Sequence, residues 1–196
     1  MIVAVIILAI AVVVLAAIAV WLYLRNRRTT RLRQQFGPEY ERTVRARGDR
    51  DEAERELEER KRRVERFPIR PLSAEEHTRY ADAWRSVQAR FVDDPSGAVG
   101  DADRLIGDVM RTRGYPVGDF ESRAADLSVE YPNVVTNYRA AHRIAEANQR
   151  GNASTEELRQ AMVHYRALFD DLLGMPHAAD TGRAATAPPP RTEAPR

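Results

Sequence analysis

The chain has 196 residues, a formal net charge of +2 and no cysteine. This length allows one modest domain with appendages, and the absence of cysteine excludes disulfides and thiolate metal sites. The basic excess is local, since residues 25–66 carry 15 basic and 10 acidic side chains. No basic or aromatic stripe continues beyond them, so nucleic-acid binding is not expected.

Residues 2–24 predict a membrane-spanning helix, because they are almost wholly Ile, Val, Leu and Ala and contain no charge. At about 1.5 Å per residue this helix would be about 35 Å long, enough to cross a hydrocarbon core of about 30 Å. Trp21 and Tyr23 lie at its end, where amphipathic rings prefer the headgroup level. The predicted anchor domain is therefore residues 1–24.

The arginines that follow this segment predict its direction. No basic side chain precedes it, so the positive-inside rule places the N-terminus outside and the long C-terminal part in the cytoplasm. The protein is then a single-pass protein of the cell membrane, with anionic lipid headgroups as partners. The predicted membrane-interface residues are Trp21, Tyr23, Arg25, Arg27, Arg28, Arg31 and Arg33.

A cleaved secretory signal is the competing interpretation, because Ala17-Ile18-Ala19 resembles a cleavage site. Such a signal needs a basic start and an apolar stretch of about 7–15 residues. The segment lacks the first and is longer than the second, so a retained anchor is favoured. Cleavage would instead leave a secreted domain.

Residues 25–67 predict a charged juxtamembrane helical segment that bends at Gly37-Pro38 and stops at Gly48. Four apolar side chains recur at every fourth position and form a narrow stripe. They are Leu32, Phe36, Tyr40 and Val44.

The second half of this segment, residues 50–67, has two interpretations. Its apolar side chains fit the a and d positions of a short coiled coil, which would self-associate or bind a partner helix. Arg60 interrupts this pattern, and too few heptads are present for a coiled-coil assignment. A solvated helix that packs one edge on its own chain is therefore favoured. The a/d residues are Ala53, Leu57, Val64 and Phe67.

Residues 68–174 predict a compact bundle of about five helices, which makes the fold class all-α, since no period-2 alternation persists. Pro68 and Pro71 break the preceding helix. Ser73 and Ser154 each open a capping box, and Asp94 caps a helix that starts at Pro95. The Ala- and Pro-rich tail, residues 175–196, is expected to be disordered.

No catalytic, cofactor or metal motif occurs in the sequence. His142 and Glu146 have a spacing that can share a metal, but no second such pair exists. The best polar constellation would line a groove if its two helices pack together, which would suit a ligand-sensing or enzymatic domain. The favoured interpretation gives the tyrosines to the core and the arginines to ion pairs. The polar constellation consists of Tyr138, Arg139, His142, His164, Tyr165 and Arg166.

Five segments together resemble a group of bacterial membrane-anchored helical proteins with no assigned activity, over roughly residues 30–174. The resemblance implies a bacterial setting and a helical domain, and no functional residues. We therefore expect a non-enzymatic, membrane-tethered interaction or scaffold module without a cofactor. The segments are Phe36-Gly37-Pro38-Glu39-Tyr40, Gln88-Ala89-Arg90-Phe91-Val92-Asp93-Asp94-Pro95, Arg113-Gly114-Tyr115-Pro116, Thr155-Glu156-Glu157-Leu158-Arg159 and His164-Tyr165-Arg166-Ala167-Leu168-Phe169.

Overall fold

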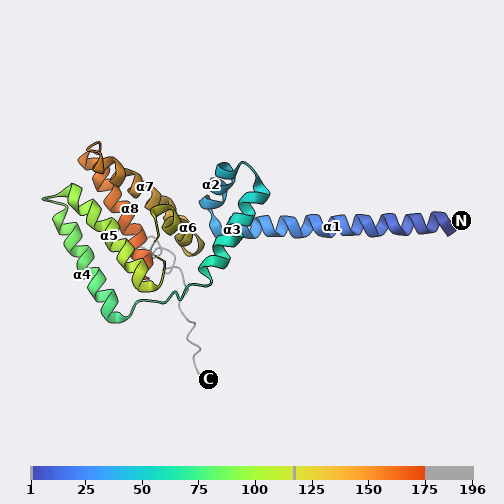
Figure 1. Cartoon of the computed structure of the whole chain (residues 1–196), viewed down its shortest axis with the longest axis horizontal. Helices are drawn as coiled ribbons and strands as arrows, with labels where there is room; N and C mark the ends of the chain where they lie inside the picture. Colours follow the sequence, from blue (N-terminus) through green and yellow to red (C-terminus); the bar gives the residue numbers. More distant parts are fainter. Residues whose placement is uncertain (1, 117, 175–196) are drawn as a thin grey trace, which may run out of the picture. The chain divides into compact units, whose positions relative to one another are not determined.

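The computed structural model describes residues 2–116 and 118–174, with their side chains except those of residues 2–9 and 11. These residues form eight helices and no strand (Figure 1). The predicted all-α class is confirmed. The tail predicted to be disordered, residues 175–196, lies outside the described residues.

The chain divides into two compact units. The first comprises Met1–Arg66 and Ala125–Asn133, and the second comprises Phe67–Ala124 and Val134–Arg196. The main division is thus next to the proline break predicted at residue 68. Residues 125–133, predicted as part of the bundle, group with the first unit instead.

The first unit contains three consecutive helices joined by glycine turns: α1 (Ile2–Phe36), α2 (Pro38–Arg47) and α3 (Arg50–Val64). Gly37 and Gly48 have φ of 48° and 74°, a left-handed region that a side chain disfavours. The sequence predicted both turns. The last helix ends at Val64, three residues before the predicted end.

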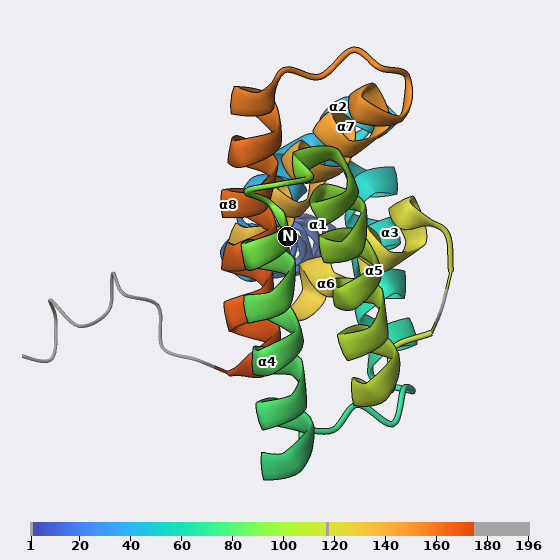
Figure 2. The ribbon, with the colours of Figure 1, turned by 90° about the vertical axis from the view of Figure 1, so that its left-hand side faces the viewer.

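Two hydrogen-bonded pairs show how α3 lies against α1. Arg25 meets Asp51 at 2.7 Å, and Thr29 donates to Glu54 at 2.7 Å. Moving along α1 therefore means moving in the same direction along α3. The two helices run in the same general sense but cross at a steep angle (Figures 1 and 2), with the start of α3 near the last third of α1.

A small apolar core holds the first unit together. It confirms the predicted four-residue stripe and adds Leu57 from α3 and Val129. The a/d side chains Ala53, Leu57 and Val64 are all buried within this same chain. A coiled coil through that face would therefore require the first unit to open. The core consists of Leu32, Phe36, Tyr40 and Leu57, with Val44 and Val129 packed against it.

Three long helices of the second unit lie lengthwise beside one another, with α5 in contact with both others (Figures 1 and 2). They are α4 (Ala74–Arg90), α5 (Pro95–Arg113) and α8 (Thr155–Leu173). The predicted capping boxes at Ser73 and Ser154 are confirmed, since each side chain accepts from the backbone three residues on.

Two further helices follow α5: α6 (Phe120–Glu130) and α7 (Pro132–Gln149). The shorter helix, α6, has 11 residues. The division between the two units passes through both helices, so each contributes residues to both.

The core of the second unit is mainly aliphatic and aromatic. Trp84 of α4 stacks on Phe169 of α8, with ring centroids 4.7 Å apart. Tyr80, Trp84 and Val87 of α4 are buried, while Phe91, which follows the end of α4, is only partly covered. Such contacts depend on shape and volume, since they involve few polar atoms.

In the part of the chain whose side chains the structure describes, no helix combines the length and the apolarity needed to cross a membrane. The predicted span covers residues 2–24, and the side chains of residues 2–9 and 11 lie outside that part. The span therefore stays a prediction.

Candidate functional site

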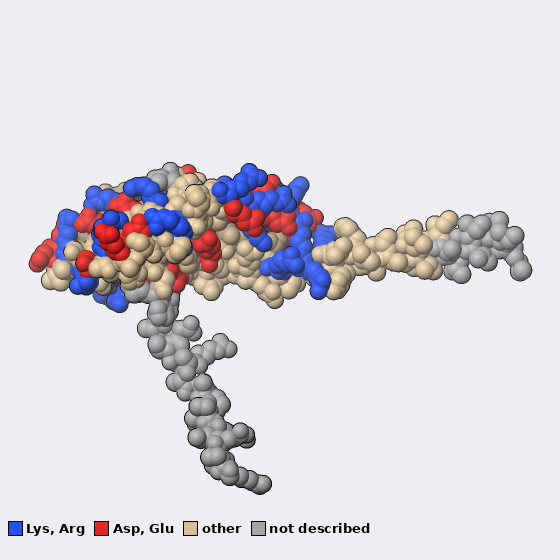
Figure 3. Space-filling model, turned by 90° about the horizontal axis from the view of Figure 1, so that it is seen from below, with Lys and Arg blue, Asp and Glu red and all other residues tan. Residues whose placement is uncertain are grey.

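The described side chains of α1 before its arginines form an exposed apolar surface. The large ones between Ile10 and Leu24 are 47% to 67% exposed. The described part of this helix is uncharged in Figure 3 until the arginines near its end. Exposed apolar surface of this extent is typical of a site of contact with another apolar body. Its members are Ile10, Val12, Val13, Val14, Leu15, Ile18, Val20, Trp21, Leu22, Tyr23 and Leu24.

The predicted interface aromatics pair with arginines one turn further along α1. The Arg25 guanidinium lies over the Trp21 ring at 5.4 Å, and that of Arg27 lies over Tyr23 at 5.2 Å. These are cation–π distances. The end of the apolar surface is therefore also the start of a cationic one.

The remaining predicted interface arginines have different surroundings. Arg28 pairs with Glu58 at 2.7 Å, and Arg33 pairs with Glu41 at 3.3 Å. Arg31 makes no ion pair with any carboxylate in the described part of the chain. The arginines predicted as one membrane-facing group thus have two roles. Some form ion pairs with α2 and α3, and Arg31 is left free of any carboxylate in the described part of the chain.

A buried carboxylate joins the three helices of the first unit. Glu54 is 2% exposed and accepts hydrogen bonds from Thr29 of α1 at 2.7 Å and Tyr40 of α2 at 2.9 Å. Burial, and next the hydrogen bond to Glu54, raise the pKa of Tyr40. This arrangement stabilises a folded unit and offers no reactive group to a substrate.

Ion pairs also connect α3 to α2 and to α6. Glu56 accepts hydrogen bonds from Arg47 of α2 and from Arg60. Its burial opposes ionisation, but these two bonds lower the pKa of Glu56 overall. Arg63 also binds the buried Asp126 at 2.6 Å, which links α3 to the part of α6 within the first unit.

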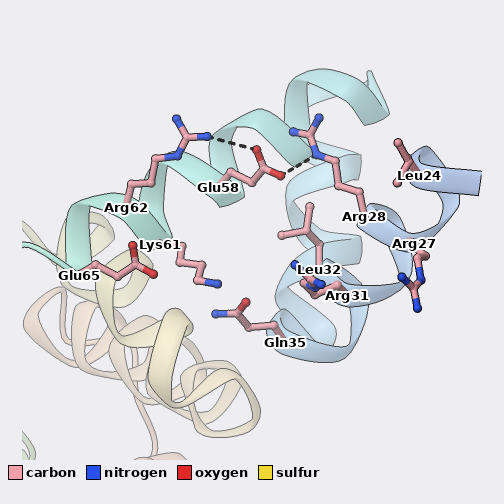
Figure 4. A pocket seen from close by; sticks show the side chains of 10 residues that line it. All are labelled: Leu24, Arg27, Arg28, Arg31, Leu32, Gln35, Glu58, Lys61, Arg62 and Glu65. Atoms are coloured by element: carbon pink, nitrogen blue, oxygen red, sulfur yellow. Dashed lines mark ion pairs between the residues drawn. The ribbon is translucent and has the colours of Figure 1, made fainter. Parts of the chain in front are cut away.

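Two grooves lie between α1 and α3, one on each side of Arg28. The first, named the α1–α3 groove, has a volume of about 420 Å³ (Figure 4), and the second has about 510 Å³. Leu24 contributes to both. The α1–α3 groove is lined by Leu24, Arg27, Arg28, Arg31, Leu32, Gln35, Glu58, Lys61, Arg62 and Glu65.

The tyrosines of the predicted Tyr/His face come together, but in the core of the second unit. Tyr138 and Tyr165 are fully buried with ring centroids 6.2 Å apart, and Tyr165 donates to Asp103 at 3.3 Å. Burial, and next the charge of Asp103, raise the pKa of both phenols. The two rings are core residues and do not wall an open groove.

The other members of that face are dispersed. Arg139 is buried and pairs with Glu121 at 2.5 Å, while the His142 ring stacks on Phe120 at 3.5 Å. His164 is partly exposed, and no hydrogen bond, ion pair or ring contact among the described residues joins it to His142. Arg166 is exposed and lies 3.6 Å from Asp170.

Metal binding gains no support from the geometry. Among the described residues, no group of three His, Cys, Asp or Glu side chains is placed to hold a metal ion. The predicted metal spacing, His142 and Glu146, brings the two side chains to 3.6 Å as an isolated pair.

Sequence reasoning missed the buried carboxylates Glu39, Glu54 and Asp126. A signal existed for one of them. Glu54 lies between the apolar positions Ala53 and Leu57, and on a helix this places it at the edge of the buried face.

Comparison of the chain with protein-family models, curated proteins and solved structures finds no match. The resemblance to bacterial membrane-anchored proteins therefore stays a prediction. The residues of the chain and their geometry are the basis on which its function is proposed.

Proposed function

We propose that the protein is a single-pass membrane-tethered, non-enzymatic interaction module. Residues 2–24 would be the anchor, with the N-terminus outside and the remainder of the chain on the cytoplasmic side. The observation that carries this proposal is the exposed apolar surface of α1, which ends where the arginines begin. A lipid bilayer is an environment in which such a surface needs no protein cover.

The polar part of the first unit fits a role as a rigid base for the anchor. Its arginines reach α2 and α3 through Arg25–Asp51, Arg28–Glu58 and Arg33–Glu41. The part of α1 that follows the apolar surface is thus joined to neighbouring helices by three ion pairs. A tether built this way holds its attached domain near the bilayer without needing a reactive site.

A partner would meet the outer, charged side of α3, since its apolar side is covered. The exposed residues Glu52, Arg55 and Glu59 lie three or four positions apart and so share one side of the helix. Alternating charge of this kind gives specificity through complementary ion pairs. We therefore place the protein-binding surface within residues 50–67 on this side.

Topology can be tested by cysteine labelling, because the natural chain contains no cysteine. We expect Ile2→Cys to react with a membrane-impermeant maleimide in intact cells. The exposed Gln160→Cys should react only after the membrane is opened. The full chain should also stay in the membrane fraction after alkaline carbonate washing. Labelling of residue 160 in intact cells, or release by carbonate, would refute the proposal.

The secreted alternative predicts a shorter protein. Cleavage after Ala19 would remove the anchor, whereas a retained anchor leaves Met1 or Ile2 as the first residue. Intact-mass measurement of the protein purified from cells separates the two, and a mass that begins after Ala19 would favour the secreted domain.

The partner surface is tested by exchanging charges without changing their number. Arg55→Glu with Glu59→Arg keeps the net charge and the ion-pair spacing but reverses the pattern. We expect this variant to lose specific neighbours in proximity labelling from the C-terminus. The matched control is Asp82→Arg with Arg85→Asp on exposed α4 positions. Equal neighbour sets for both variants and the natural chain would exclude this surface.

A further inference from the structure

The α1–α3 groove carries more positive charge than its own carboxylates neutralise. Five cationic side chains and two acidic ones line it. Glu58 alone is shared between Arg28 at 2.7 Å and Arg62 at 3.8 Å (Figure 4). Within the described part of the chain, Arg27, Arg31 and Lys61 form no ion pair with a carboxylate. The groove therefore has unneutralised cations on both walls.

These cations are arranged around a common space. Arg31 and Gln35 come from α1, and Lys61 comes from α3 on the opposite wall (Figure 4). Arginine and lysine are the side chains that bind phosphate oxygens, and a glutamine amide can add a neutral donor. A volume of about 420 Å³ also falls within the usual range of ligand sites, about 300–1,000 Å³. An acidic, oxygen-rich ligand of small size is complementary to this site.

The position of the groove along α1 indicates where that ligand comes from. Leu24 lies at one end of the groove and is the last residue of the apolar segment. Arg27 and Arg31 follow by three and seven residues, about 4.5 and 10.5 Å along the helix. The headgroup layer extends about 5–8 Å beyond the hydrocarbon on each side. With Leu24 at the hydrocarbon boundary, Arg27 lies within this layer. The backbone of Arg31 lies about 2.5 Å or more beyond it, and its long side chain points back along α1 toward the layer of lipid phosphates.

We propose that the α1–α3 groove binds the phosphate of one anionic phospholipid, with the acyl chains directed along Leu24 and the apolar surface of α1. This inference rests on the proposed membrane tether, because the lipid is its source of phosphate. It goes further by giving the anchor a specific lipid site, built partly from α3. Lipid binding would then stabilise the packing of α3 on α1.

Competition between lipids tests the site on the full chain in detergent. The probes are short-chain phosphatidylglycerol, short-chain phosphatidylcholine and inorganic phosphate, with retained ligands counted by native mass spectrometry. We expect one phosphatidylglycerol to be retained, at least tenfold in preference to phosphatidylcholine. We also expect it to bind at least tenfold more tightly than inorganic phosphate, because Leu24 and α1 add apolar contact.

Substitutions locate the binding. Arg31→Gln with Lys61→Gln should reduce phosphatidylglycerol retention at least tenfold. The control Arg45→Gln with Arg50→Gln removes the same charge from exposed positions of the first unit outside the groove and should retain the lipid. Equal loss in both pairs, no loss in the groove pair, or equal binding of phosphatidylcholine or of inorganic phosphate would each overturn the proposal.

The outcome is separable from that of the tether. Binding in detergent does not require the anchor to cross a bilayer, whereas carbonate washing and cysteine labelling do. Lipid retention that depends on Arg31 and Lys61 would support the site even if the topology tests fail. Correct topology with unchanged retention in the groove variant would overturn the site alone.

Discussion

The two units bury different kinds of side chain. Of the six polar or charged residues buried in the described part of the chain, five belong to the first unit and only Arg139 to the second. The first unit packs its carboxylates around a small apolar cluster, whereas the second packs aromatic rings such as Trp84 on Phe169. The five are Glu39, Thr43, Glu54, Asp126 and Ser128.

The stability of the two units therefore depends on different interactions. An apolar core loses stability when volume is removed, because a cavity remains. A polar core loses stability when one partner is removed, because the other is left buried without a hydrogen bond. Matched substitutions in the two units therefore separate the two causes.

The largest effect is expected from Phe169→Ala in the second unit. The ring is fully buried and stacked on Trp84, so its loss should lower the free energy of unfolding by about 3–5 kcal/mol. Urea unfolding followed by Trp84 fluorescence measures this, in a Trp21→Phe background that removes the other tryptophan. A loss below about 1 kcal/mol would contradict an apolar, volume-dependent core.

A smaller effect is expected from Glu54→Ala in the first unit, about 2–4 kcal/mol, because two hydroxyls lose their acceptor. Hydrogen exchange of α3 backbone amides measures it locally, and protection of α5 should be unchanged. Glu54→Gln is the matched control, since it keeps an acceptor for Thr29 and Tyr40 and should cost less. Equal effects of both variants would show that the charge, and not the hydrogen bonding, stabilises the unit.

The smallest effect is the loss of stability expected when the pH is lowered, and it arises from Glu76 at the start of α4. The hydrogen bond from Arg70, and next that from the Ser73 backbone, lower the pKa of Glu76 from 4.5 to about 2. A lowered pKa in the folded state means that this carboxylate stabilises fully above pH 4.5. That stabilisation is lost as the pH falls from 4.5 to about 2.

Urea midpoints at pH 6 and pH 3 check this prediction for the second unit. Glu76→Gln should reduce the difference between the two midpoints, because it removes one titrating group. The control Glu75→Gln changes a neighbouring exposed carboxylate that forms no ion pair within the described part of the chain, and it should leave the difference nearly as it is. An identical reduction by both variants would contradict a special role for Glu76.

The local features of the fold could be predicted from the sequence. Ser73 and Ser154 determine their helix starts through residues three positions away, so a short segment contains all the information. The stripe that includes Leu32 and Tyr40 was recognised by its spacing, and the structure confirms it. Gly37 and Gly48 likewise marked turns that their φ angles confirm.

The features that could not be predicted depend on contacts between distant parts of the chain. Arg63 and Asp126 are 63 residues apart, and no periodicity relates them. The burial of Glu54 results from the packing of α1, α2 and α3 together. The core position of Tyr138 and Tyr165 was the favoured interpretation, but the residues that bury them come from other helices and could not be identified from the sequence.

The contacts at the crossing of α1 and α3 have a mechanical consequence. Arg25–Asp51, Thr29–Glu54 and Arg28–Glu58 all leave α1 within residues 25–29, which span about 6 Å of helix. Tension between the apolar end of α1 and the point where the chain leaves α3 would therefore load these contacts together. A pull on whatever the chain holds would be resisted by all three at once.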